Sequence, residues 1–289
     1  MNTYDNIYYS VDDGLTLYAR DYNQASSSTV VLCMHGLSRN SADFEPLCKV
    51  LSNQYRIISV DQRGRGLSQW DTDHSRYQLP SYVEDMWQLL DQQGIDKVVL
   101  IGTSMGGLMG MLMAAQKPER VQGLVINDVG PEVDPEGLAR IMSYVGKTTE
   151  IKSWDDATAQ IRSINQVCFP NFTLDQWQAM AQRTYRENDR GVPVVNYDPN
   201  ISTPIQADKA AAVPTDLWPV FEMLTVPILT LRGCLSDLFS ADCLCRMREL
   251  KPAMQYVEVD GVGHAPVLDE PQAVESIESF LKQISIINQ

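Results

Sequence analysis

The sequence has few basic residues for its length of 289. Lysine and arginine total 23 against 37 aspartate and glutamate residues, which gives a formal net charge of -14. A protein of this charge repels the phosphates of nucleic acids and of anionic lipids, so both classes of partner are disfavoured. No uninterrupted apolar run approaches the roughly 18 residues of a membrane span. We therefore expect a soluble protein with no nucleic-acid or membrane partner.

Features of exported and metal-binding proteins are also scarce. Residues 1–6 contain neither the basic nor the apolar stretch of a secretory signal, so the expected compartment is the cytoplasm. The six cysteines form no Cys-x-x-Cys pair, and the three histidines are scattered along the chain. The glycines at 64 and 66 lack the third glycine of a dinucleotide-binding loop. We expect reduced cysteines, no metal and no organic cofactor.

Short runs of β-branched and apolar residues alternate with stretches of helical periodicity along much of the chain. This alternation is typical of an α/β protein, in which helices flank a mostly parallel sheet buried on both faces. A chain of this length can fill one such domain. Eight strands are predicted, at residues 7–11, 15–22, 29–34, 55–60, 97–101, 121–126, 227–231 and 255–259.

The alternation stops between residues 128 and 226, where helical pieces occur without a convincing buried strand. A helical module inserted between two strands of a parallel sheet would lie above their carboxyl ends, where open α/β sheets bind ligands. The sequence therefore predicts a core domain of residues 1–130 and 220–289. Residues 131–219 would form a helical cap, or lid, inserted after the sixth strand.

The most informative motif is Gly-x-Ser-x-Gly, centred on Ser104. It lies between the strand predicted at 97–101 and a helix predicted from Met105. Such a turn is so sharp that a Cβ at either glycine would collide with a neighbouring element, and the serine hydroxyl is lifted above the sheet. Ser104 is therefore the candidate nucleophile.

A serine nucleophile needs a base, and histidine is the side chain whose ordinary pKa lies nearest neutrality. His264 follows the last predicted strand in a glycine-rich loop, which would carry it over the edge of the sheet. His35 ends the strand at 29–34 and is better placed to shape the loop opposite the nucleophile. His74 lies in a polar loop. We predict His264 as the base.

The histidine must be oriented by a carboxylate that reaches its second nitrogen. Asp237, which follows the strand at 227–231, and Asp128, which follows the strand at 121–126, compete for this role. The order Ser104, Asp237, His264 is that of a nucleophile-elbow hydrolase, and it favours Asp237.

The negative charge that develops on an attacked carbonyl requires two hydrogen-bond donors. Backbone N–H groups can supply both. One is expected from Met105, at the start of a helix, and the other from Leu37, in the loop after the strand at 29–34.

Taken together, these motifs resemble the α/β-hydrolase superfamily. The resemblance rests on His35-Gly36, residues 61–68, residues 102–107 and Gly263-His264, and it covers nearly the whole chain except the variable lid. The arrangement is similar to that of capped serine carboxylesterases, meta-cleavage C–C hydrolases and enol-lactonases. Ser104 in place of an aspartate argues against haloalkane dehalogenases and epoxide hydrolases. Residues 37–40 lack the Gly-x-Gly-Pro-Gly stretch of many C–C hydrolases.

The function that this resemblance favours is hydrolysis of a small carboxylic ester through an acyl-enzyme. Lactone opening or C–C bond cleavage would use the same residues. A substrate carboxylate would then require a basic partner such as Arg39 or Arg140, although the simpler interpretation of each arginine is a surface charge. The alternative of another class is a hydrolase-fold protein that binds a small molecule with little turnover.

Overall fold

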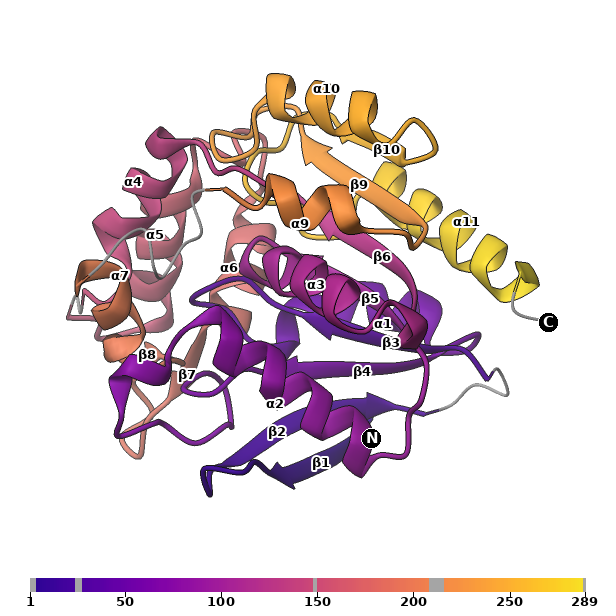
Figure 1. Ribbon diagram of the computed structural model, residues 1–289. Coiled ribbons are helices and arrows are strands. Elements are labelled where there is room, and N and C mark those ends of the chain that lie inside the picture. Colours follow the sequence, from indigo (N-terminus) through magenta and orange to yellow (C-terminus); the bar gives the residue numbers. More distant parts are fainter. Residues whose placement is uncertain (1–3, 24–27, 148–149, 208–215, 288–289) are drawn as a thin grey trace.

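The computed structural model describes residues 4–23, 28–147, 150–207 and 216–287. Figure 1 shows a twisted central sheet with helices on both sides and a further group of helices at one end. None of the helices in the described ranges combines the length and apolar character that a membrane crossing requires. Two parts of the predicted cap, residues 148–149 and 208–215, lie outside the described residues.

Eight strands form the central sheet, and they match the eight predicted ones: β1 (Asp5–Ser10), β2 (Thr16–Tyr22), β3 (Val30–Met34), β4 (Arg56–Asp61), β5 (Val98–Thr103), β6 (Val121–Asn127), β9 (Ile228–Gly233) and β10 (Gln255–Val259). Their spatial order is β1-β2-β4-β3-β5-β6-β9-β10. β2 pairs antiparallel with both β1 and β4, whereas all other neighbours are parallel. The predicted α/β-hydrolase architecture is confirmed.

Helices bury both faces of this sheet. On β5, Val99 and Ile101 pack in one core with α1 (Glu45–Leu51) and α11 (Pro271–Ile287). The alternate residues Val98 and Leu100 pack in the other core with α2 (Leu79–Gln92), α3 (Met105–Gln116), α9 (Trp218–Met223) and α10 (Ala241–Leu250). A strand buried on both faces must be apolar at successive positions, which is why central strands such as β5 are recognisable as continuous hydrophobic runs.

The segment between β6 and β9 contains a separate group of elements: α4 (Pro135–Tyr144), α5 (Trp154–Asn165), α6 (Leu174–Thr184), β7 (Tyr185–Glu187), β8 (Pro193–Val195) and α7 (Thr203–Ala207). Figure 1 places α4, α5, α6 and α7 together at one end of the sheet. β7 and β8 pair as an antiparallel hairpin that the sequence analysis missed, because three-residue strands are too short to show a periodic pattern. The assignment of residues 131–219 as a cap stays a prediction.

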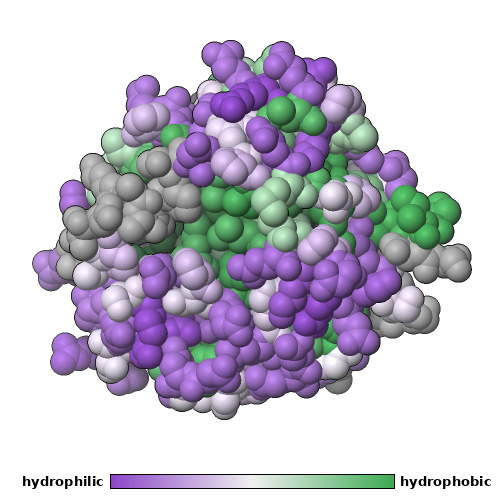
Figure 2. All heavy atoms as spheres, viewed as in Figure 1, coloured by the Kyte–Doolittle hydropathy of each residue, from purple (hydrophilic) through white to green (hydrophobic). Residues whose placement is uncertain are grey.

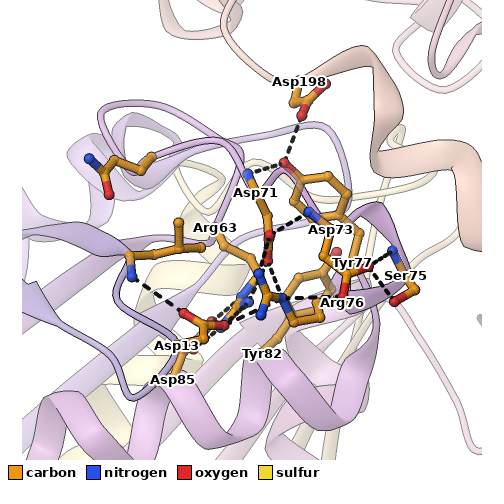
Figure 3. A network of polar contacts seen from close by, with 12 residues as sticks. Asp13, Arg63, Asp71, Asp73, Ser75, Arg76, Tyr77, Tyr82, Asp85 and Asp198 are labelled. Carbon is orange, nitrogen blue, oxygen red and sulfur yellow. Dashed lines mark hydrogen bonds and ion pairs between the residues drawn. The ribbon is translucent and has the colours of Figure 1, made fainter.

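A buried cluster of charges holds the loop after β4 (Figure 3). Arg63 is the centre of this cluster, and its side chain is 4% exposed. It pairs at 2.6–2.7 Å with three aspartates, Asp13, Asp71 and Asp85. The Tyr77 hydroxyl donates to Asp198 at 2.7 Å and so ties the cluster to the segment between β6 and β9. Removing one partner of such a buried pair costs about 3–5 kcal/mol. The cluster therefore anchors the inserted segment to the sheet.

The surface of the face seen in Figure 1 is mostly hydrophilic. Hydrophobic residues gather in a hollow near its middle, over the region of α3 and α9 (Figure 2).

Candidate active site

The turn between β5 and α3 places Ser104 in a backbone conformation that side chains rarely adopt. Its φ is 54° and its ψ is -117°, and such a conformation costs on the order of 1–3 kcal/mol. A Cβ at Gly102 would lie 2.1 Å from the carbonyl oxygen of Gly106, and one at Gly106 would lie 2.0 Å from that of Met34. Both glycines are therefore required by close backbone approach, as the motif predicts.

The Ser104 hydroxyl lies within hydrogen-bond distance of His264. Its Oγ is 2.9 Å from His264 Nε2, although 160 residues separate the two in the sequence. The His264 side chain is 9% exposed and comes from the loop that follows β10. The amide of Gly263 donates to the carbonyl oxygen of Cys168 at 2.6 Å, which holds this loop against the inserted segment. The structure thus brings the predicted nucleophile and base together.

The carboxylate beside His264 is that of Asp128. His264 Nδ1 lies 2.8 Å from Asp128 Oδ2, and the Asp128 side chain is fully buried. The amide of Gly233 donates to Asp128 Oδ1 at 2.7 Å, and the Ser236 hydroxyl donates to Oδ2 at 2.7 Å. Three donors therefore surround this carboxylate, which fixes its orientation and satisfies its charge.

The prediction that Asp237 contacts the histidine is wrong. Asp237 instead pairs with Arg140 of α4, with distances of 2.5 Å from Nε to Oδ2 and 2.9 Å from Nη2 to Oδ1. Burial raises the pKa of Asp237, but the hydrogen bonds and charge of Arg140 outweigh it and hold that pKa below its ordinary value. Asp128 directly follows β6, whereas Asp237 stands four residues beyond the end of β9 and points to the inserted segment.

The loop after β3 passes beside Ser104 and carries Leu37. The amides of Leu37 and Met105 make no hydrogen bond within the described part of the chain. Both residues line a cavity together with Ser104. The buried guanidinium of Arg65 donates from Nε to the Leu37 carbonyl oxygen at 2.9 Å. This hydrogen bond fixes the loop at Leu37. The amides of Leu37 and Met105 are therefore two backbone donors in fixed positions beside Ser104.

His35 supports the same loop. The Gln62 amide donates to His35 Nε2 at 3.0 Å, so Nδ1 carries the proton and donates to the Gly36 carbonyl oxygen at 2.7 Å. Complete burial lowers the pKa of His35 to about 3. These contacts agree with the loop-shaping position expected for it. His74 is far from this chemistry and stacks on Tyr77, with ring centroids 6.1 Å apart.

Two cavities meet at Ser104, and a third adjoins one of them. The first, the apolar cavity, has a volume of about 60 Å³ and is bounded by Leu37, Met105, Leu108 and Leu138 among others. The second, the histidine-side cavity, has about 110 Å³ and includes His264 in its wall. The third, the outer cavity, has about 520 Å³ and adjoins the second through shared residues, which are Ser38, Arg39, Tyr144 and Asn165.

Both arginines considered as partners for a substrate carboxylate are engaged in ion pairs rather than free at the surface. Arg140 is held by Asp237 and lines none of the three cavities. Arg39 pairs with Asp43, at 2.7 Å from Nε to Oδ2, and lines two of them. Within the described residues, no group of three or more histidine, cysteine, aspartate or glutamate side chains could hold a metal ion.

Comparison with known proteins assigns the family. The family model of the alpha/beta hydrolase fold matches residues 29–271. The chain belongs to the alpha/beta hydrolase family. A crystal structure of an alpha/beta hydrolase from Novosphingobium aromaticivorans superposes with a TM-score of 0.93 at 39% identity, covering 98% of this chain and 99% of that one. A solved structure thus shares the fold of this protein over 98% of the chain.

Two relatives match most of the chain. The 3-hydroxybutyrate-oligomer hydrolase of Cupriavidus necator is 32% identical over 266 residues, which are 90% of each chain. The 2-(acetamidomethylene)succinate hydrolase of Mesorhizobium japonicum is 31% identical over 255 residues, which are 88% of this chain and 87% of the relative. Both relatives are named as hydrolases, and the substrates in their names differ.

Proposed function

We propose that this protein hydrolyses a small carboxylic ester through an acyl-enzyme formed on Ser104. The observation that carries the proposal is the continuous chain of hydrogen bonds from Ser104 Oγ to His264 Nε2, at 2.9 Å, and from His264 Nδ1 to Asp128 Oδ2, at 2.8 Å. A serine, a histidine and a buried carboxylate in this order are what activates a hydroxyl for attack on a carbonyl carbon.

In the first half of the reaction, Ser104 Oγ attacks the ester carbonyl carbon and its proton passes to His264 Nε2. The amides of Leu37 and Met105 then stabilise the oxyanion of the tetrahedral intermediate. Asp128 stabilises the imidazolium and keeps Nδ1 protonated. The intermediate collapses when His264 gives its proton to the leaving alkoxide, which departs as an alcohol and leaves the acyl group on Ser104.

In the second half, a water molecule takes the place of the alcohol. His264 Nε2 accepts a proton from this water as its oxygen attacks the acyl carbon. Collapse of the second intermediate breaks the bond to Ser104, which regains its proton from His264, and the carboxylic acid is released. No electron acceptor or metal is needed to balance these steps.

The segment of residues 131–219 acts in this proposal as the cap over the substrate. Support comes from the walls of the histidine-side cavity, to which Ile141, Tyr144, Phe169 and Met180 contribute from this segment, opposite Ser104 and His264. The apolar part of this wall limits the room for water beside the acyl group. The cap therefore sets the size and polarity of the accepted ester.

The proposal is tested with p-nitrophenyl esters from acetate to decanoate and with a fluorophosphonate, which labels activated serines. We expect ester turnover and covalent labelling in the native protein, and neither in the Ser104→Ala variant. Labelling of Ser104 without ester turnover would move the activity to lactones or C–C bonds with the same residues. Absence of both labelling and turnover would contradict the proposal and favour a small-molecule binding protein.

A further inference from the structure

The histidine-side and outer cavities are lined by more cations than carboxylates, in a protein whose overall balance is the opposite. The chain as a whole carries a net charge of -14. The walls of the histidine-side and outer cavities nevertheless contain Arg39, Arg183 and Lys147, against one carboxylate, Asp43. Fields inside a cleft follow the charges that line it, so these two cavities attract an anion although the remaining surface repels it.

The three cations are not equally available to a ligand. Arg39 already makes a two-point ion pair with Asp43, and its remaining Nη1 donates to the Thr184 hydroxyl. Within the described ranges, by contrast, no carboxylate lies within ion-pair distance of Arg183 or Lys147. Arg183 is partly buried in the histidine-side cavity, and Lys147 is at the exposed rim of the outer cavity. Arg183, whose charge also acts on Glu45 beyond ion-pair distance, and Lys147 are left to attract an anionic group.

The position of His264 decides which portion of an ester this anionic group belongs to. His264 must give its proton to the leaving alkoxide, so the alcohol portion has to lie on the side of Ser104 where His264 is. His264 lines the histidine-side cavity and is not in the wall of the apolar cavity. The acyl portion therefore occupies the apolar cavity, beside Leu37 and Met105. The alcohol portion extends past His264 toward Arg183.

We propose that the substrate is an ester of a hydroxycarboxylic acid, with a short uncharged acyl group and a free carboxylate on its alcohol portion. The acyl group fits the apolar cavity of about 60 Å³, and the carboxylate binds Arg183 in the histidine-side cavity, with Lys147 adding positive charge from the adjoining outer cavity. Charge-assisted hydrogen bonds from an arginine to a carboxylate are the strong class of polar contact. This inference rests on the proposed ester hydrolysis and adds the charge and the orientation of the substrate.

The test compares esters that differ by one charge. The first is the butanoyl ester of β-hydroxybutanoate, and the second is the butanoyl ester of β-hydroxybutanamide, which has the same shape without the charge. We expect kcat/KM for the first to exceed that for the second by about tenfold or more, chiefly through KM, and this preference to shrink as salt is added. The monoethyl ester of succinate, whose charge lies in the acyl portion, is expected to be the poorest of the three.

Variants locate the origin of this preference. Arg183→Gln is expected to lower the ratio of kcat/KM between the charged and uncharged esters by about tenfold, and Lys147→Gln, which removes a charge from the adjoining cavity, by about threefold. Arg162→Gln is the matched control, because Arg162 is exposed on α5 and lines neither cavity. It removes the same charge from the neighbourhood and should keep the ratio within about twofold.

The outcomes separate this inference from the function beneath it. Equal kcat/KM for the charged and uncharged butanoyl esters, with Ser104 labelled by fluorophosphonate, would overturn the substrate class and leave ester hydrolysis in place. A preference for the succinate monoester would reverse the orientation and overturn the inference as well. An equal fall of the ratio in Arg162→Gln would show a diffuse field instead of a binding site. If no ester is turned over and Ser104 is not labelled, the proposed function fails with it.

Discussion

Asp128 and Asp237 follow neighbouring parallel strands, β6 and β9, but they have different surroundings. Asp128 is fully buried, and its carboxylate lies 2.8 Å from His264 Nδ1. The Asp237 side chain is 25% exposed and is paired with Arg140 of α4. The Asp128 carboxylate contacts His264 of the candidate active site. The Asp237 carboxylate instead holds the segment between β6 and β9 against the loop after β9.

The backbone explains why the two carboxylates diverge. Asp128 has a φ of 56°, a left-handed conformation that aspartate tolerates better than most residues, and its amide donates to the Leu231 carbonyl oxygen at 2.8 Å. This bend turns the side chain into the space between the two strand ends, where Gly233 and Ser236 donate to it. The loop after β9 therefore orients Asp128. Asp237, which belongs to this loop, is directed away from His264 toward Arg140 of α4.

The largest effect on turnover is expected from a change at Ser104, the candidate nucleophile. Ser104→Ala should lower kcat by about 10⁴-fold or more, because the attacking oxygen is lost. The fold should remain, since alanine keeps the Cβ at this position. Turnover of p-nitrophenyl butyrate and the circular dichroism melting curve measure the two effects. A variant that retained a tenth of the native turnover would contradict the role of Ser104 as nucleophile.

Asp128→Asn is expected to lower kcat by about 10³- to 10⁴-fold, because the amide neither stabilises the imidazolium nor holds Nδ1 protonated. The measurement is kcat on the same ester, with fluorophosphonate labelling rates as a second readout. Ser236→Ala is the control, since it removes one donor to Asp128 but leaves the charge next to His264. It should cost far less than the loss of the carboxylate.

Asp237→Asn tests the other side of the comparison. We expect kcat to change by less than about tenfold, and the free energy of unfolding to fall by about 1 kcal/mol through loss of the ion pair with Arg140. Urea unfolding measures the second quantity. Arg140→Gln should produce a similar loss of stability, and the double variant should lose less than the sum. If Asp237→Asn reduced kcat more than Asp128→Asn did, the roles would be reversed.

The smallest effect is a pH dependence of the Asp237–Arg140 pair. Although burial raises the pKa of Asp237, Arg140 lowers it below the ordinary value of 3.8 overall. Between these two pKa values the unfolded chain binds more protons than the native protein, so stability falls as the pH decreases. The stability difference between native protein and Asp237→Asn, under about 1 kcal/mol at neutral pH, should therefore shrink below pH 3.8. A difference that grew on acidification would show that Asp237 is not stabilised as a carboxylate.

Much of the core could be predicted from the sequence because its signals are local. All eight strands of the sheet were predicted, most of them as apolar runs, since a parallel strand in the middle of a sheet is buried on both faces. The turn at Ser104 was recognisable because its glycines are imposed by contacts of 2.0–2.1 Å that a Cβ would make with backbone. The hairpin of β7 and β8 was missed, because three residues are too few to establish a period.

The candidate site was predicted in part. Ser104 and His264 were found by their motifs, and the structure places them together. The choice between the two aspartates depended on chain order, which says nothing about the direction of a side chain after its strand ends. The adjacency of Asn127 and Asp128 to the end of β6 was a signal for Asp128, but chain order outweighed it. Of the cations that line the histidine-side and outer cavities, only Arg39 was considered from the sequence, since no local pattern places Arg183 and Lys147 in these walls.

The sequence by itself determined the fold class, the turn that presents Ser104 and the loop that carries His264, because each depends on residues adjacent in the chain. Only the tertiary structure decided that Asp128 meets His264 across a separation of 136 residues. It also decided that Asp237 pairs with Arg140 across 97 residues. These contacts follow from the order in which strands lie side by side and from the direction of the chain beyond their ends. Both are set by packing of the whole molecule.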